Sequence, residues 1–213
     1  MLKIQKFVFN PFSENTYIVW DDNSKNGAII DPGCNDDNER EAVDNFIRSN
    51  LLNLKFLINT HCHIDHIFGN AYIKKNYGVK FLAPEKDVPL LDMMMNVAKM
   101  YAVELVPSPP PDELIFDEQK FLLGKTEGKF LFTPGHSPGE VCLYFEKDKI
   151  CFTGDVLFNK NIGRTDLPGG NYDVLIDSIE NKLFTLPDDV TIYPGHGAAS
   201  TIGDEKKNNP FFR

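Results

Sequence analysis

The chain has 213 residues, and its 22 Lys and Arg against 31 Asp and Glu give a formal net charge of −9. This length favours one domain, which we expect to span residues 1–213, and an apolar content of 42% excludes wholesale disorder. No apolar run approaches the ~20 residues of a membrane-spanning helix, and no basic run suited to nucleic-acid phosphates is present. We therefore expect neither a membrane nor a nucleic acid as a partner.

Cysteine usage and the N-terminus indicate the cellular compartment. The four cysteines, Cys34, Cys62, Cys142 and Cys151, form no Cys-x-x-Cys pair, and the first residues alternate like a strand instead of forming a secretory signal. We expect reduced thiols that pack as small apolar side chains. The sequence thus predicts a cytoplasmic protein.

Strand and helix patterns alternate along the chain. β-Branched and aromatic residues predict strands at 4–9, 16–20, 28–30, 56–58, 130–132, 141–145, 150–152 and 191–193. Helical periodicity predicts helices at 39–49, 67–76, 88–101 and 174–183. The helix at 88–101 carries an apolar stripe, which we interpret as core packing, with a flexible lid or a partner surface as the alternative: Leu90, Met93, Met94, Val97 and Tyr101. The prolines at 107–111 predict a surface loop inside one domain.

The five histidines lie in three short motifs. Residues 60–66 read Thr-His-Cys-His-Ile-Asp-His, and the other two histidines follow Pro-Gly at 134–135 and at 194–195. A single histidine is more often structural than a ligand. Three histidines and an aspartate this close together nevertheless indicate metal binding, because imidazole and carboxylate are common zinc ligands. The repeated Pro-Gly-His also suggests two related halves.

The spacing in the first motif favours an extended chain. Alternate residues of an extended chain share a face, so His61, His63 and Asp65 would point one way and Cys62 would point into the core. Residues two apart on a helix do not face each other, and we expect the helix to begin only near residue 67. Since 56–58 predicts a buried strand, the motif lies beyond a strand's carboxyl end, where α/β sheets place their sites.

Two further strand ends carry candidate ligands. The run at 130–132 leads to His136, and the strand at 150–152 ends in Gly154-Asp155. The complete candidate set is His61, His63, Asp65, His66, His136, Asp155 and His196. One tetrahedral ion takes about four ligands, so this set indicates two ions about 3.5–4 Å apart that share a carboxylate and a water.

The sequence resembles the metallo-β-lactamase superfamily. The resemblance rests on His-x-His-x-Asp-His at 61–66, on the three later ligands in the same order, and on Ile-Asp-Pro-Gly at 30–33, so it spans nearly the whole chain. It implies an α/β fold, the four-layer αββα sandwich, with the site at one edge of the paired sheets. Asp31 would then support the second ion or simply form a turn.

The resemblance also implies a division of the ligands. His61, His63 and His136 would hold the first ion. Asp65, His66 and His196 would hold the second, and Asp155 would bridge the two. Zinc is the expected metal, with iron or manganese as alternatives.

Within the superfamily, the chain is most similar to the short, one-domain glyoxalase II or hydroxyacylglutathione hydrolase group. The similarity lies in Gly-Arg-Thr-Asp at 163–166, Pro-Gly-His-Gly at 194–197 and Asn-Pro-Phe-Phe at 209–212. It implies a thioesterase in which a metal-bridging hydroxide attacks a hydroxyacylglutathione-type thioester and Asp65 acts as a catalytic residue that orients it. The chain ends too soon for the extension by which longer members bind glutathione, so thioester chemistry is better supported than glutathione recognition.

Alternative functions stay open. A persulfide dioxygenase of this fold would hold one iron with His61, His136 and Asp155, and a lactone hydrolase would use the same motifs. His66 argues against a class B β-lactamase, and the complete ligand set argues against a non-catalytic binding module. Arg164 is the candidate for binding a substrate anion, unless it pairs with Asp166.

Overall fold

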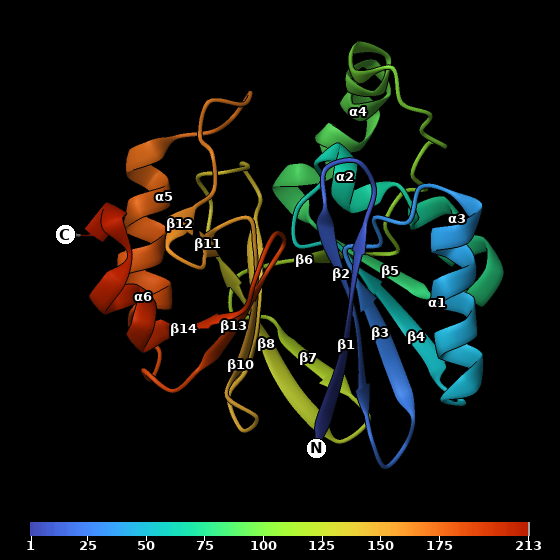
Figure 1. The fold of residues 1–213 in the computed structure, drawn as a ribbon, viewed down its shortest axis with the longest axis horizontal. Coiled ribbons are helices and arrows are strands. Elements are labelled where there is room, and N and C mark those ends of the chain that lie inside the picture. Colours follow the sequence, from blue (N-terminus) through green and yellow to red (C-terminus); the bar gives the residue numbers. More distant parts are fainter. Residues whose placement is uncertain (213) are drawn as a thin grey trace.

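Two six-stranded sheets stack face to face in the computed structural model, which describes residues 1–212 (Figure 1). The first sheet has the order β1-β2-β3-β4-β5-β6, and the second has the order β14-β13-β10-β9-β8-β7. Strands β3 to β6 are parallel to one another, as are β10 and β13. Carboxyl ends of parallel strands meet at one edge of a sheet, so the loops that follow these strands are brought together.

Most strands are short. The first sheet contains β1 (Leu2–Phe9), β2 (Glu14–Asp21), β3 (Asn26–Ile30), β4 (Asn53–Ile58), β5 (Lys80–Pro84) and β6 (Glu113–Ile115). The second contains β7 (Lys120–Leu123), β8 (Thr126–Phe132), β9 (Val141–Phe145), β10 (Ile150–Gly154), β13 (Thr191–Pro194) and β14 (Ser200–Thr201). A separate two-stranded ribbon pairs β11 (Leu157–Phe158) with β12 (Asn161–Ile162).

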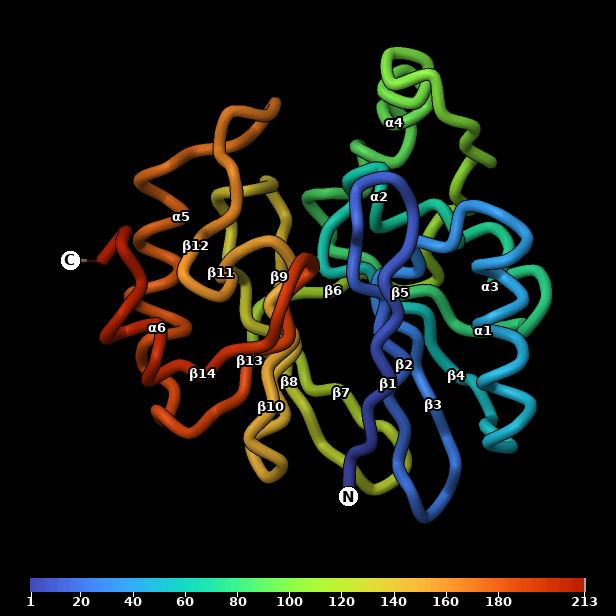
Figure 2. The backbone as a smooth tube through the Cα atoms, viewed as in Figure 1, coloured from blue at the N-terminus to red at the C-terminus, as the bar shows by residue number. Residues whose placement is uncertain are grey.

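Helices cover the outer face of each sheet. The α-helices are α1 (Asp37–Ser49), α2 (Ile64–Ile67), α3 (Asn70–Tyr77), α4 (Val88–Tyr101), α5 (Tyr172–Ser178) and α6 (Ile202–Asn208). Short 3₁₀ segments lie at Glu85–Asp87 and Pro210–Phe212, and a π-helical segment lies at Ile179–Leu183. Helices α1, α3 and α4 pack on the first sheet, and α5 and α6 pack on the second. Figure 2 shows α4 and the chain after it standing out at the top of the molecule.

The layered arrangement follows from the alternating direction of side chains along the strands. Ile29 and Leu57 point to the outer core beneath α1 and α3, whereas their neighbours Ile30 and Ile58 point to the core between the sheets. Successive strand residues face opposite sides, and strands buried on both faces are apolar throughout. The predicted αββα sandwich is therefore confirmed.

Some elements differ from the sequence-based expectation. Strands β5, β6, β7 and β14 and helix α6 were not expected, because they are short or carry few apolar residues. The helix expected at 67–76 is divided into α2 and α3 at Gly69, whose N–H donates to the Pro32 carbonyl at 2.6 Å. The helix expected at 174–183 begins at Tyr172 and ends in the π-helical turn.

The remaining structural expectations concern the cysteines and the proline-rich loop. All four cysteines are free and buried, as expected for packing residues. The chain at 107–111 is an irregular loop that leads from α4 into β6, which pairs with β5 of the first sheet. Among residues 1–212, no helix has the length and apolarity that crossing a bilayer requires.

Candidate metal centre

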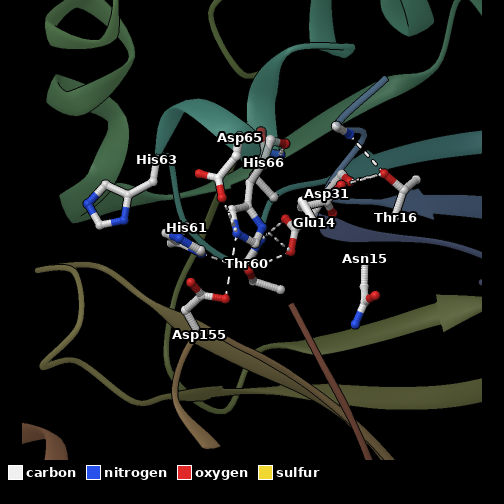
Figure 3. A network of polar contacts seen from close by, with 12 residues as sticks. Glu14, Asn15, Thr16, Asp31, Thr60, His61, His63, Asp65, His66 and Asp155 are labelled. Carbon is white, nitrogen blue, oxygen red and sulfur yellow. Dashed lines mark hydrogen bonds and ion pairs between the residues drawn. The ribbon is translucent and has the colours of Figure 1, made fainter. Parts of the chain in front are cut away.

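Loops at the carboxyl ends of β4, β8, β10 and β13 bring the candidate ligands together. The first motif follows β4, His136 follows β8, Asp155 follows β10 directly, and His196 follows β13. Figure 3 shows Asp155 approaching His61 and His66 from the side opposite to Asp65. The candidate site thus lies where the two sheets meet, with ligands from both.

A first group contains only imidazoles. His61, His63 and His136 each offer a ring nitrogen, and these nitrogens all lie within 4.8 Å of one another. His63 Nδ1 is 2.8 Å from His136 Nε2. All three side chains are buried, so their donor atoms lie within the folded protein and not on its outer surface.

A second group combines a carboxylate with two imidazoles. Asp65 Oδ2 lies 3.6 Å from His66 Nε2 and 3.2 Å from His196 Nε2. These donor atoms also lie within 4.8 Å of one another. Asp31 forms an overlapping group with His61 and His66, but its carboxylate is already hydrogen-bonded to Thr60.

Asp155 lies between the two groups. Its Oδ2 is 3.6 Å from His136 Nε2 and 3.5 Å from His196 Nε2, and its Oδ1 is 3.6 Å from His66 Nε2. The side chain is therefore in reach of both sets of donors, which is the position that a carboxylate shared by two ions needs.

The local structure of the first motif differs from the extended chain that its spacing suggests. His63 is extended (φ −73°, ψ 158°), but it is the N-cap of α2, which begins at Ile64. The His66 N–H donates to the His63 carbonyl at 3.2 Å and closes this first turn. Asp65 therefore reaches the site from a helical turn and not from the face of a strand. Cys62 is fully buried in the outer core, as expected.

The second ring nitrogen of most histidines already has an oxygen nearby. Nδ1 of His66 is 3.2 Å from Asp31 Oδ2, Nδ1 of His136 is 2.7 Å from the Arg164 carbonyl, and Nδ1 of His196 is 3.2 Å from the Ser13 carbonyl. Nδ1 of His61 is 3.1 Å from Thr60 Oγ1. Metal-binding imidazoles characteristically use one nitrogen for such a partner and present the other to the ion. Asp31 thus lies beside His66 and does more than form a turn.

Several buried polar atoms at the centre lack a hydrogen-bond partner. Among the described residues, they include His61 Nε2, His66 Nε2 and Asp155 Oδ1. Native proteins rarely leave buried polar atoms unsatisfied. A set of imidazole nitrogens and carboxylate oxygens directed at one volume fits divalent cations such as zinc, so the residues present fit the metals that the sequence suggests.

The protonation states also suit metal binding. Burial, together with the neighbouring imidazoles, lowers the pKa of His61 and lowers that of His63 to about 4. Burial alone would raise the pKa of Asp65, but the charge on His66 and a hydrogen bond from His196 lower it below its ordinary value. Neutral imidazoles and an ionised carboxylate are the forms that ligate metals.

His66 differs from the other buried imidazoles. Burial alone would lower the pKa of His66, but Asp65, Asp155 and Asp31 surround the ring and raise this pKa instead. The same negative charge that favours a proton on His66 favours a bound cation. Metal binding at this group would therefore displace a proton.

Two buried carboxyl groups support the ligand loops and were not found by sequence reasoning. Asp87 Oδ2 accepts hydrogen bonds from the Cys62 N–H at 3.1 Å and from the Ser137 hydroxyl at 2.6 Å, so it joins the first motif to the loop that carries His136. Glu140 Oε1 accepts the Asp155 N–H at 2.6 Å and lies 3.5 Å from His61 Nδ1. Locally, Asp87 resembles an ordinary residue before a helix, and no motif marks Glu140, so only the assembled loops reveal them.

Arg164 is placed beside the site but is paired. It lines the cavity in front of the ligands, and its Nε and Nη2 donate to Oδ1 and Oδ2 of Asp166, both at 2.7 Å. The alternative that the sequence left open, a pair with Asp166, is thus present in the structure.

A cavity of about 410 Å³ opens over the ligands. Its floor includes His63, Asp65, His136, Asp155 and His196. Its walls include the whole apolar stripe of α4, from Leu90 to Tyr101. Leu90 and Met94 are buried as expected for core packing, but Met93 is 45% exposed and Tyr101 is 52% exposed. The interpretation of the stripe as core packing is therefore correct for only part of it.

The fold and the grouped donors define a class of protein, and comparison with known families gives the same class. The family model described as the metallo-β-lactamase superfamily matches residues 9–196. The chain therefore belongs to the metallo-β-lactamase superfamily.

Individual relatives are similar over nearly their whole length. The chain is 39% identical to the hydroxyacylglutathione hydrolase GloC of Haemophilus influenzae, covering 99% of this chain and 98% of that protein. It is 33% identical to the probable metallo-hydrolase YqgX of Bacillus subtilis, with coverage of 99% and 97%. Among solved structures, the BLEG-1 B3 metallo-β-lactamase has a TM-score of 0.90 at 31% identity, covering 100% of this chain and 99% of that one. The chain is thus an enzyme of the metallo-hydrolase superfamily with His and Asp clusters suited to metals.

Proposed function

We propose that the protein is a metal-dependent thioester hydrolase that acts on hydroxyacylglutathione-type thioesters and binds two divalent ions. His61, His63 and His136 would hold one ion, and Asp65, His66 and His196 the other. Asp155 would be shared, since it lies 3.5–3.6 Å from imidazole nitrogens of both groups. This position of Asp155 is the observation that carries the proposal. Zinc is the first metal to test. Iron is the second, because a solved structure that is 29% identical to this chain, TTHA1623, is in a di-iron-bound form.

When bound, divalent ions supply Lewis acidity to a carbonyl and lower the pKa of a coordinated water toward 7. The protein's own contribution is position and charge. Asp65, held ionised, would accept a hydrogen bond from the attacking water and orient it. Orientation of reacting groups lowers the barrier because less freedom is lost at the transition state.

The net reaction is hydrolysis. Water adds to the thioester carbonyl, a C–O bond forms, the C–S bond breaks, and the products are a carboxylic acid and a thiol. The likeness to GloC supports glutathione as the first thiol carrier to test. The buried, reduced cysteines are compatible with a cytoplasmic enzyme that handles thiols.

The decisive experiment uses Asp155→Ala. We expect this variant to lose bound metal and turnover together, because removal of a shared ligand weakens both sites. Metal content is measured on protein purified without added ions, and turnover is measured with S-lactoylglutathione. Asp188→Asn, which changes an exposed carboxylate, serves as the matched control and should keep both. Full activity of Asp155→Ala with less than one ion per chain would refute the two-metal proposal.

The same preparations separate the alternative functions. A glutathione persulfide with oxygen uptake tests the persulfide dioxygenase, a lactone tests the lactonase, and a cephalosporin tests the β-lactamase suggested by one structural relative. Hydrolysis of the thioester at a kcat/KM at least 100-fold above that for each competing substrate is the expected result. Oxygen uptake with one iron per chain would instead assign the dioxygenase.

A further inference from the structure

The cavity over the candidate metal centre has apolar walls on two sides. One wall comes from α4 and the loop before β2 and includes Met93, Val97, Tyr101 and Phe12. The Phe12 and Tyr101 rings meet edge to face with centroids 5.4 Å apart, so this wall is continuous. The other wall comes from the segment after Asp155 and includes Phe158 and Leu167. In Figure 1, α4 stands at the upper right of the molecule, and β11 and β12 lie in its left half at about mid-height.

The walls of the cavity contain little positive charge that could hold an anionic carrier. Arg164 is the sole Lys or Arg that lines it in the described part of the chain, residues 1–212. The guanidinium forms two 2.7 Å hydrogen bonds with Asp166, so its charge is already compensated. A glutathione moiety carries two carboxylates, and the chain as a whole has a net charge of −9. Recognition of such a carrier would require cations that these walls do not offer.

The acyl chain and the thiol carrier of a thioester would not fit this cavity equally well. If the reacting carbonyl lies over the ligands on the floor, the rest of the substrate must contact the walls. Thiol carriers are polar, and buried polar groups without partners weaken binding, whereas apolar chains gain affinity from apolar walls. We infer that the cavity binds an apolar acyl chain and that the enzyme selects its substrate by this chain instead of by the carboxylates of glutathione. This inference rests on the proposed thioester hydrolysis.

The test uses metal-loaded protein and thioesters of N-acetylcysteamine, a small neutral thiol. Acetyl, butanoyl, hexanoyl and octanoyl esters are compared, and hexanoylglutathione is the charged counterpart of the hexanoyl ester. We expect kcat/KM to rise by up to about fourfold per methylene until the cavity is filled, and to differ less than about threefold between the two hexanoyl carriers. A flat or falling chain-length series, or a preference above about tenfold for glutathione, overturns the inference.

Two glutamate substitutions on α4 test which part of this helix causes the dependence of kcat/KM on acyl chain length. Met93 lines the cavity, whereas Met100 is 84% exposed on the same helix and does not line it. Met93→Glu should lower the octanoyl-to-acetyl ratio of kcat/KM at least about tenfold, and Met100→Glu should leave that ratio unchanged. Equal effects of both variants contradict the assignment of the wall.

A binding measurement distinguishes failure of this inference from failure of the proposed function. The probes are the uncleavable thioethers S-octyl- and S-ethyl-N-acetylcysteamine, titrated calorimetrically into metal-loaded and chelated protein. We expect the octyl compound to bind at least about tenfold more tightly, and Met93→Glu to abolish this difference. If no thioester is hydrolysed but this preference holds, the thioesterase proposal fails and the apolar site stands. Equal binding of the two thioethers rejects the apolar site.

Discussion

Gly195 illustrates how closely backbone and ligands pack at this centre. A Cβ atom at this position would lie 2.3 Å from Asp155 Oδ1 and 2.7 Å from His66 Cε1. Real Cβ contacts are not this short, so any side chain here must displace a ligand. Gly197, two residues further on, has a φ of 78° but no atom within 4 Å of its Cβ position.

We therefore expect Gly195→Ala to weaken metal retention at least about tenfold, because Asp155 or His66 must move. Gly197→Ala is the control: it should lower the free energy of unfolding by about 1 kcal/mol through its left-handed backbone but retain metal. Metal content after dialysis and urea unfolding measure the two effects. Normal metal content in Gly195→Ala would contradict the close packing.

The lowered pKa of His63 predicts that the stability of the metal-free protein depends on pH. Its pKa is lowered to about 4, mainly by burial, whereas an exposed histidine has an ordinary value near 6.5. Below pH 6.5 the unfolded chain binds a proton that the folded chain does not, so stability is present at neutral pH and falls as pH decreases toward 4. The shift corresponds to about 3 kcal/mol.

The chelated His63→Asn variant should lack the part of this loss that comes from His63. The difference in unfolding free energy between the chelated wild type and the chelated His63→Asn variant should change by about 3 kcal/mol from pH 7 to pH 4. It should stay constant above pH 7. Urea titrations at several pH values measure it. A difference that does not vary with pH would show that His63 is not held neutral.

At the scale of elements, α4 connects the loops that carry the candidate metal ligands to the cavity wall. Its N-cap is Asp87, which is hydrogen-bonded to the loops of Cys62 and Ser137. Its C-cap is Ala102, whose φ of 52° and ψ of 39° are left-handed. Glycine is the usual residue at this position after a helix, because a Cβ atom disfavours that conformation.

Ala102→Gly should therefore raise the free energy of unfolding by about 0.5–1 kcal/mol, since relief of backbone strain exceeds the added freedom of the unfolded chain. Ala98→Gly, inside the same helix and buried, should lower stability by about 1 kcal/mol or more. Urea unfolding compares both with the wild type. A destabilised Ala102→Gly would mean that the helix end is not strained.

At the scale of the whole molecule, the centre joins the two sheets. Ligands come from loops after β4 in the first sheet and after β8, β10 and β13 in the second. Ions bound only by the folded chain stabilise it by mass action, by about 4 kcal/mol when their concentration is 1,000 times the Kd. For a chain of this length, that corresponds to about 8–16 °C in Tm.

Chelation should consequently lower the Tm by about this amount, and added zinc should restore it. Differential scanning calorimetry measures the shift, with Asp155→Ala as the control that should respond much less. A wild-type Tm that is insensitive to chelator would contradict metal binding between the sheets.

The sequence alone determined the layered fold and the chemical character of the centre. Apolar runs at 28–30 and 56–58 specify buried strands, because strands covered on both faces need apolar residues throughout. His61, His63 and His66 predict metal binding by residue type and spacing, since few other roles need so many imidazoles together. Short strands such as β6, which spans Glu113–Ile115, carry too little pattern to be recognised locally.

Only the tertiary structure decided how the ligands are supported and what the cavity is lined with. Asp87 and Ser137 are 50 positions apart, and Arg164 and His136 are 28 apart, so local sequence carries no sign of either contact. The start of α2 at Ile64 depends likewise on a turn packed within the assembled loops. Propensity and periodicity describe neighbours along the chain, whereas these features arise where distant segments pack together and satisfy one another's buried polar groups.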